Sequence, residues 1–221
     1  MTKKIPLAFP SLPLLLAGGN LRVGGVTYFV HSGQVRACLS KREKRSTKTE
    51  NEVKTQGAFT AVRRFWSVYR RALNGLKIWS VVARERGRGK SDSLFHSVNA
   101  AAISPEGKVW AYPAFRFAEG SLAMPVVREV EREGWTVRVA WEEGTGCVGA
   151  DAADRLYVGY FYEGEGGSPC LLEVAGATRG DGSAEFTLPA AGMPEGTPLH
   201  LYFFFSSPDG TRFSPSVYVA C

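Results

Sequence analysis

The C-terminal half of the chain is dominated by short segments of β-prone residues. Six such segments follow Phe115 at intervals of roughly 12 to 22 residues, with Gly, Pro, Asp and Ser between them. They are TVRVAW, RLYVGYFY, CLLEVAG, AEFTLPA, PLHLYFFF and SVYVA. Short strands separated by turn residues, without helices between them, are typical of an antiparallel sandwich. We therefore expect residues from about 120 to 221 to form an immunoglobulin-like β-sandwich of about six to eight strands, without a long helix.

The alternation of side chains within these segments predicts which faces are buried. In residues 135–141 every second position is Trp or Val, while Thr136, Arg138 and Ala140 occupy the other face, so one face is core. In residues 155–162 both faces are apolar, with Leu156 on one side and Tyr157 on the other. This second pattern predicts a central strand, or one that the N-terminal part of the chain covers.

The N-terminal half combines a hairpin with helices. Within residues 21–39, VTYFV and QVRACL are β-prone and are separated by His31-Ser32-Gly33, which predicts a β-hairpin. A two-stranded hairpin is marginal by itself, so we expect it to pack on something or to pair with another chain. Residues 40–54 are highly charged and form a linker, an arm or the exposed start of a helix.

A long amphipathic helix is expected from Thr49 to Leu73. Thr49 is a plausible N-cap, because Glu50 and Glu52 follow in the first turn. At about 100° per residue the apolar side chains share one sector, and the arginines lie opposite. The side chains expected to be buried are those of Phe59, Val62, Phe65, Trp66 and Tyr69, whereas those of Arg64 and Arg71 are expected to be exposed.

Two further segments complete the predicted fold. Residues 76–83 either extend the helix or form a short strand, and residues 93–102 are expected to form a second short helix. The fold class is therefore α+β, with an N-terminal β-hairpin plus helices and a C-terminal immunoglobulin-like sandwich. The expected domains are a basic region, 1–115, and an acidic sandwich, 116–221.

The two halves carry opposite charge. Residues 1–116 contain 21 Lys or Arg and 6 Asp or Glu, a net charge of +15, whereas residues 117–221 contain 6 and 15, a net charge of −9. Charges of this size attract oppositely charged surfaces in the same molecule, in a neighbouring copy arranged head to tail, or in separate partners. Self-association or a larger protein assembly is the partner we expect.

The candidate interaction residues are the cations of the arm and of the helix. They are Lys41, Arg42, Lys44, Arg45, Arg63, Arg64, Arg70 and Arg71. These cations, interleaved with Trp66, Tyr69 and Trp79, also suit a nucleic-acid-binding surface, which would use phosphate contacts and base stacking. That alternative competes with core packing, which is the commoner role of an apolar helical stripe.

The start of the chain loosely resembles a secretory signal, since two lysines precede an apolar run. Pro6, Pro10 and Pro13 interrupt the run, so cleavage is not expected, and no segment approaches the roughly 20 apolar residues of a membrane helix. A virion, another particle or the cytoplasm is the favoured location. The four cysteines match no zinc or haem spacing and are expected to be free thiols.

Several segments of the chain carry a resemblance to a known family. They are GGVTYFVHSGQVRACLS, residues 49–59, FHSVN at 95–99, AFRFAEGSL at 114–122 and SVYV at 216–219. With these segments the chain resembles an uncharacterised family of Bacteroidota, a domain of unknown function whose members look like small phage-type or surface proteins. The resemblance implies the same two-part fold and no catalytic residues. Relatives often place Gln and Arg where this chain has Glu52 and Gln56.

Motifs that would carry chemistry have simpler explanations. GRGKS at 87–91 lacks the first glycine of a phosphate-binding loop, because Arg84 stands there. The three histidines lie far apart in the sequence, and the acidic loop 142–154 lacks EF-hand spacing for calcium. The tripeptide 179–181, RGD, which integrins read, is first of all a turn sequence. We expect no enzyme activity, no cofactor, no metal and no small-molecule substrate.

Taken together, these features favour a non-enzymatic structural or assembly protein, as part of a phage-like or cell-surface particle. Nucleic-acid binding through the basic N-terminal half is the alternative.

Overall fold

The chain forms two compact units, Met1–Thr49 and Glu50–Cys221. The computed structural model describes residues 20–31, 34–40 and 47–221. The domain boundary expected after residue 115 lies inside the second unit. The physical reason is that the helices and the sandwich share one hydrophobic core, which includes Phe65 and Phe95 on the helices and Phe161 and Tyr202 on the sheet.

The N-terminal unit contains a three-stranded antiparallel sheet in the order β1-β2-β3. Its strands are β1 (Leu21–Val23), β2 (Val26–His31) and β3 (Gln34–Leu39). The expected hairpin corresponds to β2 and β3, which pair from Val26↔Leu39 to His31↔Gln34. Strand β1 was not predicted. It pairs with β2 because Gly24 and Gly25 between them both have positive φ, as a two-residue hairpin turn requires.

Three helices begin the second unit: α2 (Glu50–Ala72), α3 (Ile78–Glu85) and α4 (Ser91–Asn99). The helices expected at 49–73 and 93–102 are thus confirmed, and the ambiguous segment 76–83 is mostly helix. It does not continue α2, because Asn74 and Gly75 adopt positive φ values and end that helix. None of the helices in the described ranges is long and apolar enough to cross a membrane.

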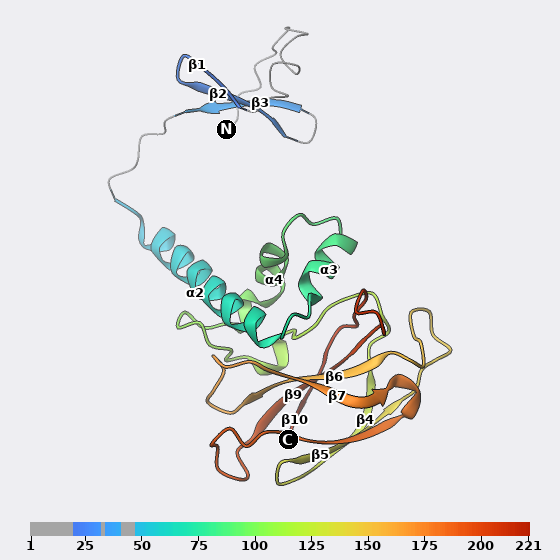
Figure 1. Cartoon of the computed structure of the whole chain (residues 1–221). Helices are drawn as coiled ribbons and strands as arrows, with labels where there is room; N and C mark the ends of the chain where they lie inside the picture. The colour runs from blue at the N-terminus through green and yellow to red at the C-terminus, as the bar shows by residue number, and fades with distance from the viewer. Residues whose placement is uncertain (1–19, 32–33, 41–46) are drawn as a thin grey trace. The chain divides into compact units, whose positions relative to one another are not determined.

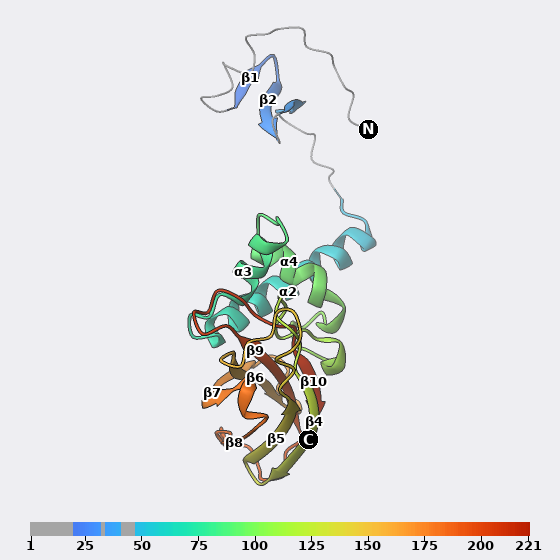
Figure 2. The ribbon, with the colours of Figure 1, turned by 90° about the vertical axis from the view of Figure 1, so that its right-hand side faces the viewer.

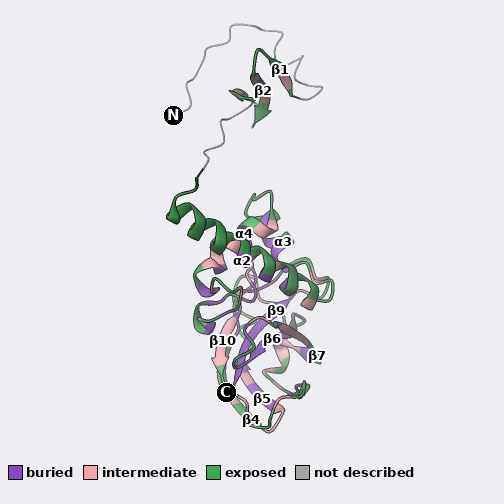
Figure 3. Cartoon of the chain, turned by 90° about the vertical axis from the view of Figure 1, so that its left-hand side faces the viewer, coloured by how far each residue is buried: buried purple, intermediate pink, exposed green. Residues whose placement is uncertain are grey.

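The buried face of α2 is shorter than its periodicity predicted. Val62, Phe65 and Tyr69 are buried and Trp66 is half-buried, but Phe59 is 46% exposed, so its predicted burial is wrong. The reason is that burial begins only at Ala61, and the preceding turns of α2 extend beyond the helices they pack on (Figure 3).

Seven antiparallel strands form the sandwich, as expected, without a long helix among them. They are β4 (Val126–Glu133), β5 (Thr136–Glu142), β6 (Arg155–Tyr162), β7 (Cys170–Thr178), β8 (Ser183–Thr187), β9 (Leu199–Ser206) and β10 (Val217–Ala220). One sheet has the order β4-β5-β8 and the other β10-β9-β6-β7. In immunoglobulin lettering these sheets are A-B-E and G-F-C-C′, so the sandwich is immunoglobulin-like.

The four-stranded sheet is the middle of three layers. One of its faces packs on β4-β5-β8 through a core that contains Leu156, Val158 and Phe203. The other face packs on the helices and on the connection that precedes β4 (Figure 1). The prediction that residues 155–162 are covered on both sides is thereby confirmed, since Tyr157 and Phe161 join the helical core.

Hydrogen bonds of buried side chains tie the helical layer to the sandwich. The hydroxyl of Tyr69 accepts a bond from Trp79 Nε1 (3.0 Å) and donates one to the carbonyl oxygen of Phe117. The hydroxyl of Tyr202 on β9 donates to the carbonyl oxygen of Tyr112 (2.7 Å). These tyrosines satisfy polar groups that have no access to water.

We expect the protein to lose stability at alkaline pH through its buried tyrosines. Burial raises the pKa of Tyr69, Tyr160 and Tyr202 above the ordinary value of 10.0. A raised pKa in the folded state contributes stability that is complete below the unfolded pKa of about 10 and is lost as pH rises above it. Urea unfolding from about pH 8 to about pH 11, followed together with tyrosinate absorbance, tests this. A free energy of unfolding that stays constant over that range would contradict it.

Candidate interaction surfaces

The four arginines predicted on the helix lie on the exposed side of α2. Arg64 and Arg71 point away from the core, while Arg63 and Arg70 lie on the flank of the helix. Arg71 Nε donates to the carbonyl oxygen of Ser67 one turn earlier (3.1 Å). The structure therefore brings these four residues together on one helix. The other four candidates, Lys41, Arg42, Lys44 and Arg45, lie outside the described residues.

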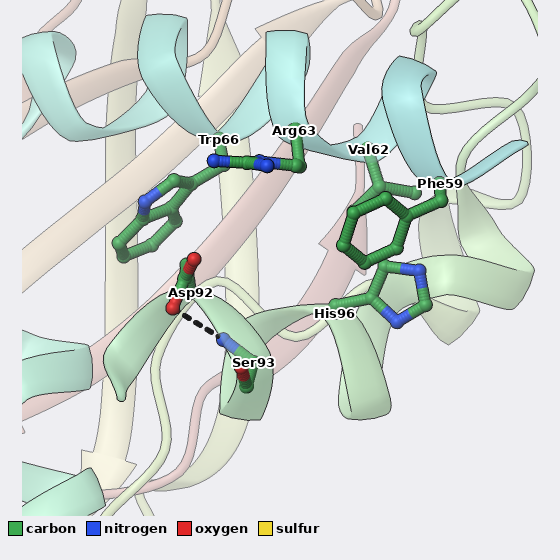
Figure 4. Close-up of a pocket in the computed structure, with 7 residues that line it drawn as sticks. All are labelled: Phe59, Val62, Arg63, Trp66, Asp92, Ser93 and His96. Carbon is green, nitrogen blue, oxygen red and sulfur yellow. Dashed lines mark hydrogen bonds between the residues drawn. The ribbon is translucent and has the colours of Figure 1, made fainter. Parts of the chain in front are cut away.

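The flank of α2 borders two hollows that meet at Trp66. In the first, the ring of Phe59 lies against that of His96 of α4, tilted by 51° with centroids 5.0 Å apart, and the guanidinium of Arg63 lies 5.7 Å from the Phe59 ring centroid (Figure 4). This hollow measures only about 10 Å³, which is roughly room for one water molecule. The second measures about 220 Å³ and is bordered by Arg70, Lys77 and Ser80, among others.

The aromatic side chains of this region belong mainly to the core. Tyr69 and Trp79 are fully buried, and Trp66 packs against Tyr69 and Phe95 with ring centroids 5.8 and 4.8 Å away. Base stacking requires an accessible ring face. Of Trp66, Tyr69 and Trp79, only part of Trp66 meets this requirement, so the geometry favours core packing over nucleic-acid recognition for these three rings. Phe59 of the same stripe is exposed and lies against His96.

The outer face of β4-β5-β8 carries the opposite charge. Its glutamates are Glu129, Glu131, Glu133, Glu142 and Glu185, and its cations are Arg128 and Arg138. Arg138 pairs with Glu185 across the strands, and Arg128 pairs with Glu142. The glutamates therefore outnumber the cations five to two, and three of them, Glu129, Glu131 and Glu133, lie exposed on the edge strand β4.

The two charged surfaces lie on opposite outer layers of one unit (Figure 2). From residue 50 to residue 92 the helical layer has 10 Lys or Arg and 4 Asp or Glu, a net charge of +6. Part of this charge is compensated locally, since Arg86 pairs with Glu119. The sheet at the far side is acidic, and an apolar sheet separates the two.

The arginine of the RGD tripeptide forms a buried ion pair. Arg179 is 1% exposed, and its Nε donates to Asp154 Oδ2 at 3.0 Å. Its Nη2 donates to the carbonyl oxygen of Ala123 (2.8 Å), and its guanidinium lies 4.0 Å from the Phe205 ring centroid. The arginine of the RGD tripeptide is therefore not available to an integrin. Asp154 is equally committed, which removes one oxygen donor from the acidic loop considered for calcium.

The remaining motifs form no recognisable reaction centre. GRGKS lies between helices α3 and α4, so the strand that precedes a phosphate-binding loop is missing there. His200 is buried and its nitrogens meet Glu163 Oε2 (2.6 Å) and Tyr218 Oη (2.9 Å), while its ring stacks on Tyr112. Over the described part of the chain, no three His, Cys, Asp or Glu side chains are grouped so as to hold a metal ion.

Three layers and their charges define an α+β protein in which an immunoglobulin-like sandwich carries a basic helical cover. The chain belongs to the family of unknown function DUF6266, whose model matches residues 44–220. The matched range extends from α2 to β10 and leaves out β1, β2 and β3. The expectation of an uncharacterised family is thus confirmed for residues 44–220.

Among curated proteins none matches this chain. Among solved structures, the chicken CNTN1 FN1–FN3 domains are similar at 11% identity, with a TM-score of 0.34, over 47% of this chain and 33% of that one. This chain therefore corresponds to about a third of the length of that structure.

Proposed function

We propose that this chain is a non-enzymatic assembly protein, in which the basic helical layer of one copy binds the acidic outer sheet of the next. A place in a phage-like or cell-surface particle, and an origin in Bacteroidota, are the finer parts of the proposal. The observation that carries it is that opposite charges occupy opposite layers of one compact unit.

The arrangement supports a contact between unlike surfaces. Such a contact leaves one free basic and one free acidic surface on every pair, so it repeats into a ring or an open chain. Immunoglobulin-like sandwiches are frequent interaction modules, which agrees with this role by analogy of fold. Exposed arginines and glutamates at the rim of such contacts contribute specificity and speed of association.

We expect the assembled form to lose mass as the salt concentration rises from low to roughly molar, because the Debye length falls to about 3 Å. Arg63→Glu combined with Arg70→Glu should weaken association at fixed low salt. Analytical ultracentrifugation measures both effects. Arg155→Glu combined with Arg212→Glu changes the net charge equally on exposed residues outside the helical layer, and should have a smaller effect.

A compact monomer at low salt and high protein concentration would refute the proposal. The alternative is favoured by one feature, the half-buried Trp66 between Arg63 and Arg70. If the monomer formed a salt-sensitive complex with added DNA or RNA, nucleic-acid binding would become the preferred function.

A further inference from the structure

The outermost stripe of α2 is narrow and mostly small. Between Arg64 and Arg71 it presents Ser67 and Val68, and Val68 is 37% exposed although it is apolar. The two arginines are seven residues apart, so they project in nearly the same direction about 10.5 Å from each other. This stripe therefore has one exposed apolar side chain, that of Val68, between two cations.

The outer face of the acidic sheet has an open hollow lined by residues of all three strands. The hollow measures about 450 Å³, and its floor includes Ala140 of β5 and Ser183 of β8, which pair directly. Because these residues lie on neighbouring strands, the hollow runs across the strands. Small side chains there allow a helix to approach the sheet closely.

Glutamates border this hollow at a matching distance. Glu131 pairs with Arg138, and Arg138 pairs with Glu185, so the two glutamates are separated by two strand spacings, about 9.6 Å. Arg138 lies between them and pairs with Glu185 at 2.5 Å, so an arginine that reaches Glu185 shares this carboxylate with Arg138. The spacing of the glutamates is therefore close to that of Arg64 and Arg71.

We infer that α2 of one copy docks across the strands of β4-β5-β8 of a second copy. Val68 lies over Arg138 and the neighbouring pair of Ala140 and Ser183, and Arg64 and Arg71 reach the glutamates on β4 and β8. This inference rests on the proposed function, because it specifies which parts of the two layers meet. It commits to a second copy of the chain because the two surfaces complement each other in charge and in the spacing of their charged side chains.

Charge exchange tests the pairing. Arg64→Glu with Arg71→Glu, and separately Glu131→Arg with Glu185→Arg, should each raise the dissociation constant of self-association at low salt by about tenfold or more. The variant with all four substitutions should recover most of the loss, since each exchanged helix then meets an exchanged sheet. The matched control is Arg84→Glu with Arg88→Glu, which reverses two exposed cations elsewhere in the helical layer and should have less effect.

Crosslinking gives a second readout that does not depend on charge. In a background in which the exposed Cys147 is replaced by serine, Val68→Cys is placed on one tagged copy and Ser183→Cys on another. Oxidation of the mixture should give a disulfide-linked pair, and neither copy alone should give as much.

The outcomes separate the two claims. If the wild-type chain is a monomer at low salt, the proposed function fails. If it associates but the exchanged residues behave like the control and the cysteines do not crosslink, then the copies meet elsewhere and only the docking inference is wrong.

Discussion

Replacing Arg179 by alanine is expected to lower the free energy of unfolding by about 3–5 kcal/mol. The substitution leaves the carboxylate of Asp154 buried without its cation, and Asp154 Oδ1 already has no hydrogen-bond partner in the protein. It also removes the bond from Arg179 to the carbonyl oxygen of Ala123, which lies in the connection before β4. Urea denaturation followed by circular dichroism measures the loss.

Two variants show whether the loss comes from an unpaired buried charge. Arg179→Met combined with Asp154→Leu removes both charges and should cost less than Arg179→Ala alone. Arg155 and Glu173 form an exposed pair at 3.6 Å, so Arg155→Ala should change stability by no more than about 1 kcal/mol. A loss in Arg179→Ala as small as that in Arg155→Ala would show that the buried pair does not stabilise the sandwich.

Gly120→Ala is expected to destabilise the protein by about 3 kcal/mol or more, or to prevent folding. A Cβ atom on Gly120 would lie 1.9 Å from the carbonyl oxygen of Phe213, and backbone atoms cannot move aside cheaply. Two backbone hydrogen bonds on either side hold Gly120 close to Phe213. Leu122 N donates to the carbonyl oxygen of Phe213 (2.9 Å), and Ser216 N donates to that of Ala118 (3.0 Å).

Gly89→Ala is the matched control, because nothing lies within 4 Å of its added Cβ and the position needs no positive φ. Its stability should be unchanged or raised by up to about 1 kcal/mol, through the reduced entropy of the unfolded chain. Thermal and urea unfolding of both variants give the comparison. Equal stability of Gly120→Ala and Gly89→Ala would mean that the segment before β4 can move away from Phe213 without cost.

The sandwich could be predicted because successive side chains of a strand point to opposite faces, so buried and exposed positions alternate in the sequence. The alternation in β5 and the doubly apolar β6 indicated one covered face and two covered faces, and both predictions are confirmed. The extent of the core under α2 was not predictable in the same way. Periodicity places Phe59 on the correct side of the helix, but it does not reveal where the helix leaves its neighbours.

Of the two candidate surfaces, the sequence clearly indicates only the basic one on α2. The arginines of α2 stand out because they repeat every seven residues on one helix. The acidic sheet needs the register between β4, β5 and β8, which brings Glu131, Arg138 and Glu185 into one row although the last is 47 residues beyond Arg138. The alternating glutamates 129–133 were the one available signal. Similarly, Arg179 reads as part of a loop motif until the fold brings Asp154 beside it.

The apolar middle sheet keeps the basic and the acidic surfaces of the C-terminal unit apart, so this unit has an electric dipole. Packed layers are about 10 Å apart, so the basic and acidic surfaces are separated by roughly 20 Å, which is more than the Debye length of about 8 Å at physiological salt. The charges therefore do not neutralise each other within one molecule. At low salt their fields extend into solution and would turn an approaching copy into the head-to-tail orientation before contact. In the proposed assembly, salt should thus slow the encounter of two copies as well as weaken their complex.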